Sequence, residues 1–159
     1  MKHLELFAGI GGFRRAMDLL TKDNVMEFHC VGYSEIDIKA ELTYRANYNI
    51  DENEFVLGDI VAFTGNKKNI KSLPKFDLLT GGFPCQTFSM MGSQAGFEED
   101  RGQMFFRIMD ILVIKKPKYV LLENVKNLRN HDKGRTFNRI KHELESIGYH
   151  VYADIFNTS

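Results

Sequence analysis

Leu4-Glu5-Leu6-Phe7-Ala8-Gly9-Ile10-Gly11-Gly12, near the start of the 159-residue chain, is the stretch that decides the fold. Residues 4–7 are typical of a short β-strand, and residues 8–12 form a glycine-rich turn. Apolar residues then recur at helical spacing: Phe13, Ala16, Met17 and Leu20. A strand, a glycine turn and a helix in this order begin nucleotide-binding α/β domains, where glycine lets the backbone pass close to a ligand.

The glycine turn departs from the common phosphate-binding patterns. After Gly9 and Gly11, Arg14 occupies the third glycine position of the dinucleotide fingerprint, and no Gly-Lys-Ser/Thr follows as in a P-loop. The turn therefore suits an adenosyl ligand that lacks a pyrophosphate. An NAD-linked oxidoreductase with a redox cysteine is an alternative, but it predicts the missing glycine and often a Cys-x-x-Cys pair, which the chain also lacks.

Acidic residues follow the next two predicted strands. Residues 27–34 form a strand that ends at Glu35, whose carboxylate can accept both hydrogen bonds from a ribose diol. Residues 55–57 form a strand that ends at Gly58, Asp59 and Ile60. Asp59 could bind an adenine amino group while Ile60 packs on the ring. Three strand ends of this kind in succession predict an adenosyl-binding site.

A cysteine follows the fourth predicted strand. Residues 76–79 form a short buried strand, and Thr80-Gly81-Gly82-Phe83-Pro84-Cys85-Gln86-Thr87-Phe88-Ser89 is expected to break it and expose Cys85. A buried structural cysteine is the simpler interpretation of this residue type. The fifth strand, residues 119–122, ends at Glu123 and Asn124. Because the fourth and fifth strands commonly lie side by side, we expect Glu123 and Cys85 to open into one cleft.

The rest of the chain completes an α/β domain. Helices are predicted near residues 37–48, 104–113 and 137–147. Residues 62–74 are predicted to be a solvated polar loop, residues 90–101 a mobile or functional connection, and residues 149–156 a sixth strand. We therefore expect one domain over residues 1–159, a doubly wound, mostly parallel sheet with helices on both faces.

Composition is that of an ordinary globular domain, with 43% hydrophobic and 26% charged residues. No apolar run approaches membrane-spanning length, and no signal peptide is recognisable. Two cysteines, of which Cys30 is expected in the core, indicate a reducing cytoplasm. The net charge of zero argues weakly against nucleic-acid binding by this chain alone. Residues 126–141 are basic, either as a solvated helix face or as a local strip that binds phosphates.

Three of these segments together resemble signature motifs of the DNA cytosine-5 methyltransferases, and they stand in that family's order. They are residues 6–13, residues 82–86 and Glu123-Asn124-Val125. Residues 96–102 resemble the family's mobile catalytic loop. The resemblance implies a Rossmann-like methyltransferase fold, S-adenosylmethionine as cofactor, no metal, and cytosine in double-stranded DNA as substrate. It also implies a prokaryotic or phage-encoded enzyme, as in restriction-modification.

The resemblance also assigns roles to single residues. The cofactor would be bound by Phe7, Gly9, Ile10, Gly12, Glu35, Ile36, Asp59, Ile60, Pro84 and Met104. Cys85 would be the catalytic nucleophile and Glu123 its partner on the base. Residues on the side of the substrate or DNA would be Phe83, Gln86, Ser89, Arg101 and Asn124, with Ser89 and Arg101 either on phosphates or purely structural.

These residue types fit the chemistry of methyl transfer to a pyrimidine carbon. The C5 atom of cytosine is a weak nucleophile, and addition of a thiolate at C6 raises the electron density at C5. A carboxylic acid at N3 supports the addition. The target base must also be flipped out of the duplex.

The family has parts that these 159 residues do not include, so we expect a truncated catalytic domain. The missing parts are a Gln-x-Arg-x-Arg segment, the target-recognition domain, a late Asn-containing motif and a C-terminal helix. Three hypotheses stay open: half of a split methyltransferase, a truncated product that is inactive alone, or a cofactor-binding module without chemistry. An exposed, truncated sheet edge predicts self-association or a partner chain.

Overall fold

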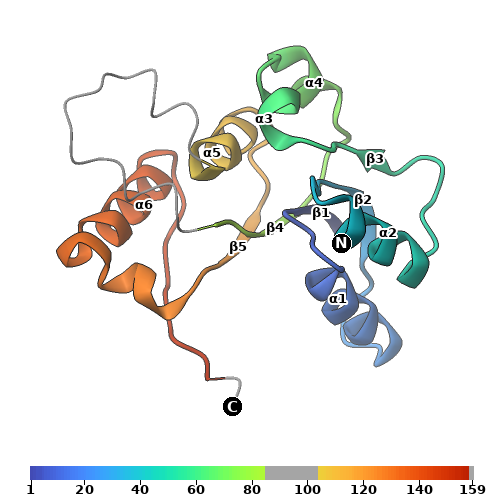
Figure 1. Ribbon diagram of the computed structural model, residues 1–159, viewed down its shortest axis with the longest axis horizontal. Coiled ribbons are helices and arrows are strands. Elements are labelled where there is room, and N and C mark those ends of the chain that lie inside the picture. Colours follow the sequence, from blue (N-terminus) through green and yellow to red (C-terminus); the bar gives the residue numbers. More distant parts are fainter. Residues whose placement is uncertain (85–103, 158–159) are drawn as a thin grey trace.

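The computed structural model describes residues 1–84 and 104–157, which form a parallel five-stranded sheet with helices on both faces (Figure 1). The strands are β1 (Lys2–Leu6), β2 (His29–Tyr33), β3 (Phe55–Val56), β4 (Leu78–Gly82) and β5 (Tyr119–Glu123). The α-helices are α1 (Gly12–Lys22), α2 (Ile38–Asn47), α3 (Ile60–Thr64), α4 (Lys67–Ser72), α5 (Met104–Lys115) and α6 (Arg135–Ser146). Two 3-10 helices, η3 (Lys126–Arg129) and η4 (His131–Gly134), lie between β5 and α6.

The strand order β3-β2-β1-β4-β5 reverses at the centre of the sheet. From β1 the chain moves outward through β2 and β3, then returns to β4 on the other side of β1. Such a reversal leaves a crevice at the carboxyl ends of the strands, which is where open α/β sheets bind ligands. The predicted doubly wound, Rossmann-like fold is confirmed.

Alternation along β1 gives the sheet two different buried faces. Leu4 and Leu6 are fully buried in the apolar core, on the face covered by α3, α4, α5 and α6. Further core residues come from the helices of this face: Ile60, Ile70, Phe105, Ile108, Ile111, Leu112, Ile140 and Leu144. His3 and Glu5 are buried on the opposite face, which α1 and α2 cover (Figure 1).

The second face holds a polar network in place of an apolar core. The ring atom Nε2 of His3 lies 2.7 Å from Oγ1 of Thr80, and the hydroxyl of Tyr44 donates a hydrogen bond to Glu5 at 3.2 Å. Burial raises the pKa of Glu5 to about 7. Burial, together with the positive charge of Arg14, lowers the pKa of His3 to about 4. Both groups are therefore held largely in their neutral forms at mildly acidic pH.

Glu5 and His3 have opposite effects on how the free energy of unfolding changes with pH. Folded Glu5 binds its proton more tightly than the unfolded chain, so its contribution falls as the pH rises from 4.5 to about 7. Folded His3 binds its proton less tightly, so its contribution rises from pH about 4 to 6.5. We expect Glu5→Gln to make the free energy of unfolding rise with pH more steeply than in the wild type, by up to about 1.4 kcal/mol per pH unit.

Urea unfolding at about pH 5 and about pH 6.5 measures this slope. His3→Gln should change the slope in the opposite direction, which makes the two variants controls for each other. Equal slopes in the wild type and both variants would contradict the assignment.

The structure corrects the prediction that Gly81 and Gly82 end the fourth strand. Both belong to β4, where Gly81 pairs with Leu6 and Leu122, and Gly82 pairs with Glu123. A central strand keeps its ladder of hydrogen bonds through a glycine, because the backbone alone forms the ladder. A Cβ atom at Gly82 would lie 3.1 Å from Oε2 of Glu123, so the absence of a side chain makes room for this carboxylate.

The predictions of secondary structure for two other segments are also wrong. Within the predicted loop 62–74 lie most of α3 and all of α4, because Asp59 and Asn66 cap these short helices by accepting hydrogen bonds from Val61 and Lys68. Residues 149–156, predicted as a sixth strand, form no strand. An alternating pattern yields a strand only where a neighbour completes the hydrogen-bond ladder, and these residues pair with no strand of the described chain.

Candidate functional site

A cavity of about 480 Å³ lies at the carboxyl ends of the strands on the β1-to-β3 side of the sheet. It is lined by Phe7, Ser34, Glu35, Ile36, Gly58, Asp59, Ile60, Val61, Pro84 and Met104. Seven of these were expected at a cofactor site from the sequence: Phe7, Glu35, Ile36, Asp59, Ile60, Pro84 and Met104. A volume of this size suits a small-molecule ligand.

The glycine turn directly follows Phe7 in the chain and has unusual backbone angles. Gly9 has φ +56° and Gly11 has φ +92°, a region that favours glycine because it has no Cβ. Phe7, which lines the cavity, also has a positive φ, of 54°. Strained residues of this kind concentrate at binding sites. The expected cofactor residues Gly9, Ile10 and Gly12 do not line the cavity, and Ile10 is exposed.

Glu35 holds the end of β2 against the glycine turn. Its Oε2 accepts a hydrogen bond from the backbone of Gly9 at 2.7 Å, and Oε1 accepts from Ile36 and Asp37 at 2.8 and 2.7 Å. Each carboxylate oxygen can accept more than one hydrogen bond, so a diol could still donate to this group. The sequence predicted the carboxylate but not its backbone partners, which require the folded turn.

The third strand end forms the opposite side of the cavity. Asp59 begins α3, and its Oδ1 accepts a hydrogen bond from the backbone of Val61 at 2.8 Å. Ile60 is buried in the core, whereas Ile36 is 72% exposed across the cavity and available to pack on a flat ring. Ser34 and Val61 also line the cavity, and the sequence does not predict them as site residues. Gly58, with φ +61°, stands at the predicted strand end, where a glycine directly before an acid is the signal for it.

The ends of β4 and β5 lie next to each other, as predicted. Gly82 pairs with Glu123, and the side-chain amide of Asn124 donates a hydrogen bond to the backbone carbonyl of Phe83 at 2.7 Å. Phe83 is buried and packs against Phe105, with ring centroids 5.8 Å apart. The described contacts of Phe83 and Asn124 therefore position the strand ends, and their contact with substrate stays a prediction.

Four expected site residues lie outside the described residues: Cys85, Gln86, Ser89 and Arg101. Pro84, the last described residue before Cys85, lines the cavity. Glu123 is exposed at the end of β5. Pro84, which lines the cavity, and Glu123 thus follow or end two adjacent strands, β4 and β5.

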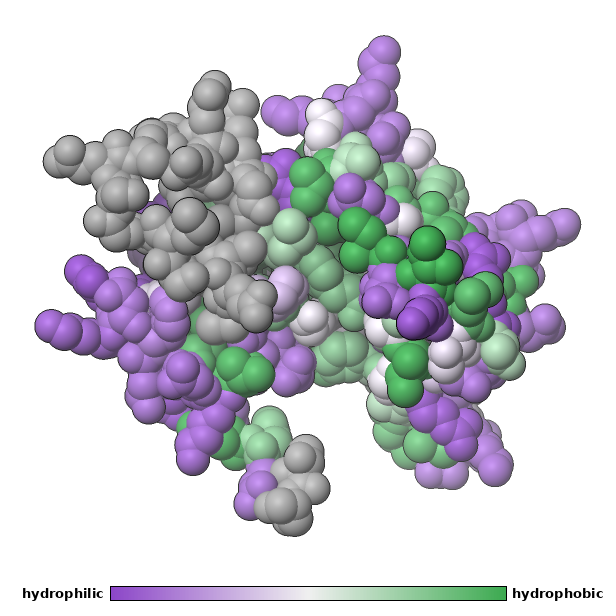
Figure 2. Space-filling model, in the orientation of Figure 1, coloured by the Kyte–Doolittle hydropathy of each residue, from purple (hydrophilic) through white to green (hydrophobic). Residues whose placement is uncertain are grey.

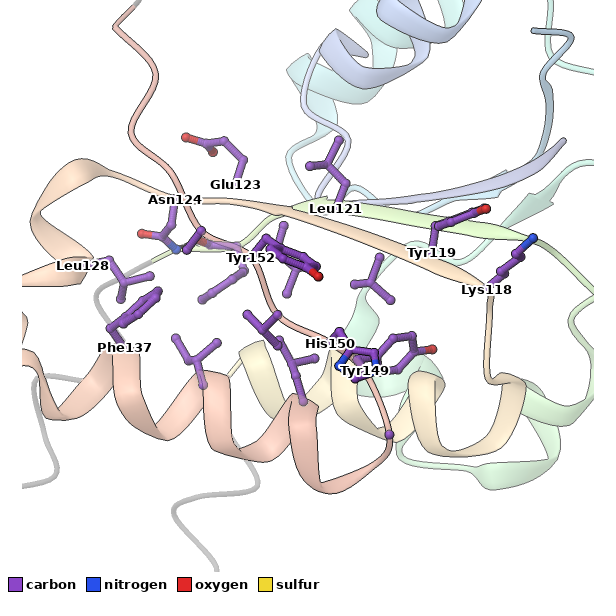
Figure 3. Close-up of a pocket in the computed structure, with 18 residues that line it drawn as sticks. Lys118, Tyr119, Leu121, Glu123, Asn124, Leu128, Phe137, Tyr149, His150 and Tyr152 are labelled. Atoms are coloured by element: carbon purple, nitrogen blue, oxygen red, sulfur yellow. Dashed lines mark hydrogen bonds between the residues drawn. The ribbon is translucent and has the colours of Figure 1, made fainter.

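A second hollow, of about 560 Å³, lies between β5, α6 and residues 148–153 (Figure 3). Leu128, Phe137, Ile140 and Leu144 contribute apolar side chains to it, and Glu123 and Asn124 are also among its lining residues. We call this hollow the β5–α6 groove. The sequence analysis did not predict it, because it depends on how α6 lies across the sheet.

Cys30, the cysteine outside the predicted site, is a poor candidate for a nucleophile. Burial raises the pKa of Cys30 to about 11, and its sulfur lies against the hydroxyl of Tyr44 at 3.9 Å. A thiol with this pKa is protonated at neutral pH. Cys30 therefore has a structural role, but it is half-buried on β2 and is not part of the apolar core that the sequence predicted for it.

Three of the six basic residues in the stretch 126–141 are paired with acids. Arg135 forms an ion pair with Asp132, Arg139 pairs with Glu143 at 2.6 Å, and Lys141 lies 3.7 Å from Glu145. Spacings of three and four residues place these pairs along the exposed side of a helix. Of the two interpretations, the solvated helix face accounts for these contacts.

Comparison with known proteins identifies this arrangement. The family model described as C-5 cytosine-specific DNA methylase matches residues 1–159. The chain belongs to this family of cytosine methylases. It is 44% identical over 154 residues to the type II methyltransferase M.NlaX of Neisseria lactamica, which covers 97% of this chain and 45% of that protein. It is 41% identical over 158 residues to an orphan methyltransferase of Bacillus phage rho11s, covering 99% of this chain and 29% of the relative.

The cytosine methylase chain therefore spans between 29% and 45% of the length of these curated relatives. A DNMT2 variant from Spodoptera frugiperda matches with a TM-score of 0.54 and 25% identity, over 89% of this chain and 40% of that one. A prophage-encoded protein of E. coli matches with a TM-score of 0.65 and 21% identity, over 92% and 38%, and supports the fold alone. In residues 1–84 and 104–157, no helix is both long and apolar enough to cross a membrane.

Proposed function

We propose that this chain is the cofactor-binding and catalytic part of an enzyme that transfers a methyl group from S-adenosylmethionine to C5 of cytosine in double-stranded DNA. The observation that carries the proposal is the cavity at the strand reversal, lined by the acids and apolar residues expected from the sequence. Family membership supports the reaction class. Restriction-modification is the setting that the names of the type II relatives suggest.

The residues of the cavity fit an adenosyl cofactor. Glu35 would accept hydrogen bonds from the ribose hydroxyls, and Asp59 would accept one from the adenine amino group. Ile36, with its exposed side chain, would pack on the adenine ring. When bound, the cofactor supplies an electrophilic methyl group.

The chain's own residues would then activate the base. The thiolate of Cys85 adds to C6 of the flipped cytosine, a carbon–sulfur bond forms, and the electron pair moves to C5. Glu123 donates a hydrogen bond to N3 and so neutralises the charge that develops in the ring. After C5 gains the methyl group it loses its proton, the carbon–sulfur bond breaks, and the thiolate of Cys85 is regenerated.

We further propose that this chain associates along β5 with a second polypeptide or with a second copy of itself. The outer edge of β5 has no strand beside it in the described chain, and Tyr119 and Leu121 of β5 are about half exposed. The β5–α6 groove lies beside the same strand. Figure 2 shows apolar surface gathered across the middle of one face. Unpaired strand edges and apolar patches favour association with another chain.

This second proposal predicts the behaviour of the purified chain. We expect it to elute from a size-exclusion column as an oligomer or to bind a polypeptide that carries the family segments lying beyond residue 159 in the relatives. Leu121→Lys should reduce that association, while Lys141→Glu, on the exposed side of α6, should not. The proposal would be contradicted by a wild-type chain that is monomeric and does not bind such a polypeptide.

Covalent trapping tests the proposed reaction. The chain is mixed with S-adenosylmethionine and duplex DNA containing 5-fluorocytosine, in which fluorine blocks the final elimination. We expect an adduct on Cys85 by mass spectrometry, either with the chain alone or after an associating polypeptide with the remaining family segments is added. Cys85→Ser should abolish the adduct and Cys30→Ser should not. No adduct under either condition would contradict the proposed reaction and point to a non-catalytic relative.

A further inference from the structure

A buried cluster beneath the glycine turn has no role in the site described so far. It consists of Glu5 on β1, Arg14 on α1, Tyr44 on α2, and Tyr48 and Glu54 on the segment between α2 and β3. Glu5 and Tyr44 are completely buried, and the side chains of Arg14 and Glu54 are only 11% and 6% exposed. Such a cluster costs desolvation energy, so its geometry calls for an explanation.

Tyr48 is the member that contacts the glycine turn directly. Its hydroxyl donates a hydrogen bond of 2.6 Å to the backbone carbonyl of Gly11. A Cβ atom at Gly11 would lie 2.2 Å from Cε2 of the Tyr48 ring, so ring and turn are in close contact. The guanidinium carbon of Arg14 lies 5.0 Å from the centre of the same ring. The contact with Arg14 fixes the position of the Tyr48 ring, and the hydrogen bond from Tyr48 fixes the backbone of the turn.

Arg14 connects the start of α1, directly after the glycine turn, to the segment that leads into the β3 wall of the cavity. Its guanidinium makes a bidentate ion pair with Glu54, with distances of 2.7 and 2.9 Å. Glu54 immediately precedes β3, and residues 58–61 after β3 line the cavity. The backbone of Arg14 itself follows the turn at the start of α1. One side chain therefore spans from the glycine turn to the strand that carries Asp59.

We propose that Arg14 and Tyr48 are positioning residues for the cofactor site: Tyr48 fixes the shape of the glycine turn, and Arg14 fixes its distance from the β3 wall. The inference rests on the proposed binding of S-adenosylmethionine. Planar, bidentate geometry is what arginine provides and lysine does not. An apolar cluster of equal volume could fill the same space, but it would not fix these distances through directed hydrogen bonds.

Substitutions of Tyr48 and Arg14 should affect the binding of different parts of the ligand. Tyr48 acts on the turn alone, whereas Arg14 acts on the turn and on the wall expected to hold adenine. Tyr48→Phe should weaken S-adenosylmethionine binding about three- to tenfold, which corresponds to one hydrogen bond, and should change adenosine binding less than about twofold. Arg14→Met should weaken both ligands at least tenfold, and Arg14→Lys should not restore them.

Isothermal titration calorimetry with S-adenosylmethionine and with adenosine measures these affinities, with thermal melting in parallel. Tyr33→Phe is the matched control, because it also removes a buried tyrosine hydroxyl, whose bond to Glu41 lies away from the turn. A general loss of packing would lower the melting temperature and weaken both ligands equally in all variants, which would overturn the proposal. Equal affinity in the wild type and Tyr48→Phe would also overturn it. If the wild type binds neither ligand, the proposed function itself fails.

Discussion

Gly11→Ala is expected to lower the free energy of unfolding by about 2–4 kcal/mol and to abolish measurable binding of S-adenosylmethionine. Gly11 has φ +92°, where an L-residue is strained by about 1–2 kcal/mol. The new methyl group would also overlap the Tyr48 ring, since its carbon would lie only 2.2 Å from Cε2 of that ring. The ring must then move, and its hydrogen bond to the Gly11 carbonyl is lost with it.

Gly12→Ala is the matched control for this prediction. Gly12 begins α1, and nothing lies within 4 Å of a Cβ placed there, so alanine should leave stability unchanged or raise it slightly. The loss of stability in Gly9→Ala should lie between those of the other two variants. The φ of Gly9, +56°, is strained for alanine, but a Cβ there would meet open space. Urea unfolding of the three variants measures the order of their losses in stability, and Gly12→Ala is a control for stability alone. Equal losses at Gly11 and Gly12 would contradict it.

Glu123→Gln is expected to reduce methyl transfer and the rate of adduct formation by about 10²- to 10⁴-fold. Glutamine keeps the shape of the side chain but cannot neutralise charge on the base by proton sharing at N3. Glu123 is exposed at the end of β5, so the substitution should change the free energy of unfolding by less than about 0.5 kcal/mol. A large loss of reaction without a loss of stability distinguishes a catalytic group from a structural one.

The assay uses the form of the protein that gives an adduct in the trapping experiment. Glu145→Gln is the control, since Glu145 is an exposed acid that pairs with Lys141 on the same helix. Cofactor affinity should be equal in the wild type and both variants, because Glu123 does not line the cofactor cavity. An unchanged rate in Glu123→Gln would remove this residue from the reaction.

Local sequence determined the elements and the order of the strand ends. The alternation in residues 4–7 and the glycines that follow were sufficient to predict a strand, a turn and a helix, because these patterns depend on neighbours in the chain. Acids at Glu35 and Asp59 were recognisable because each stands at the end of a predicted strand. Seven expected cofactor residues line one cavity, since the carboxyl ends of parallel strands meet at one edge of the sheet.

Only the tertiary structure decided how distant residues combine. Arg14 looked like a departure from a glycine pattern, and its ion pair with Glu54 spans 40 residues of sequence. Gly81 and Gly82 continue β4 because β1 and β5 lie on either side, while residues 149–156 have the pattern of a strand and pair with no strand of the described chain. The periodicity of apolar residues in the sequence indicates which side of a helix or strand is buried. Partner strands, ion pairs and the β5–α6 groove depend on contacts between distant segments, which are determined when the whole sheet is packed.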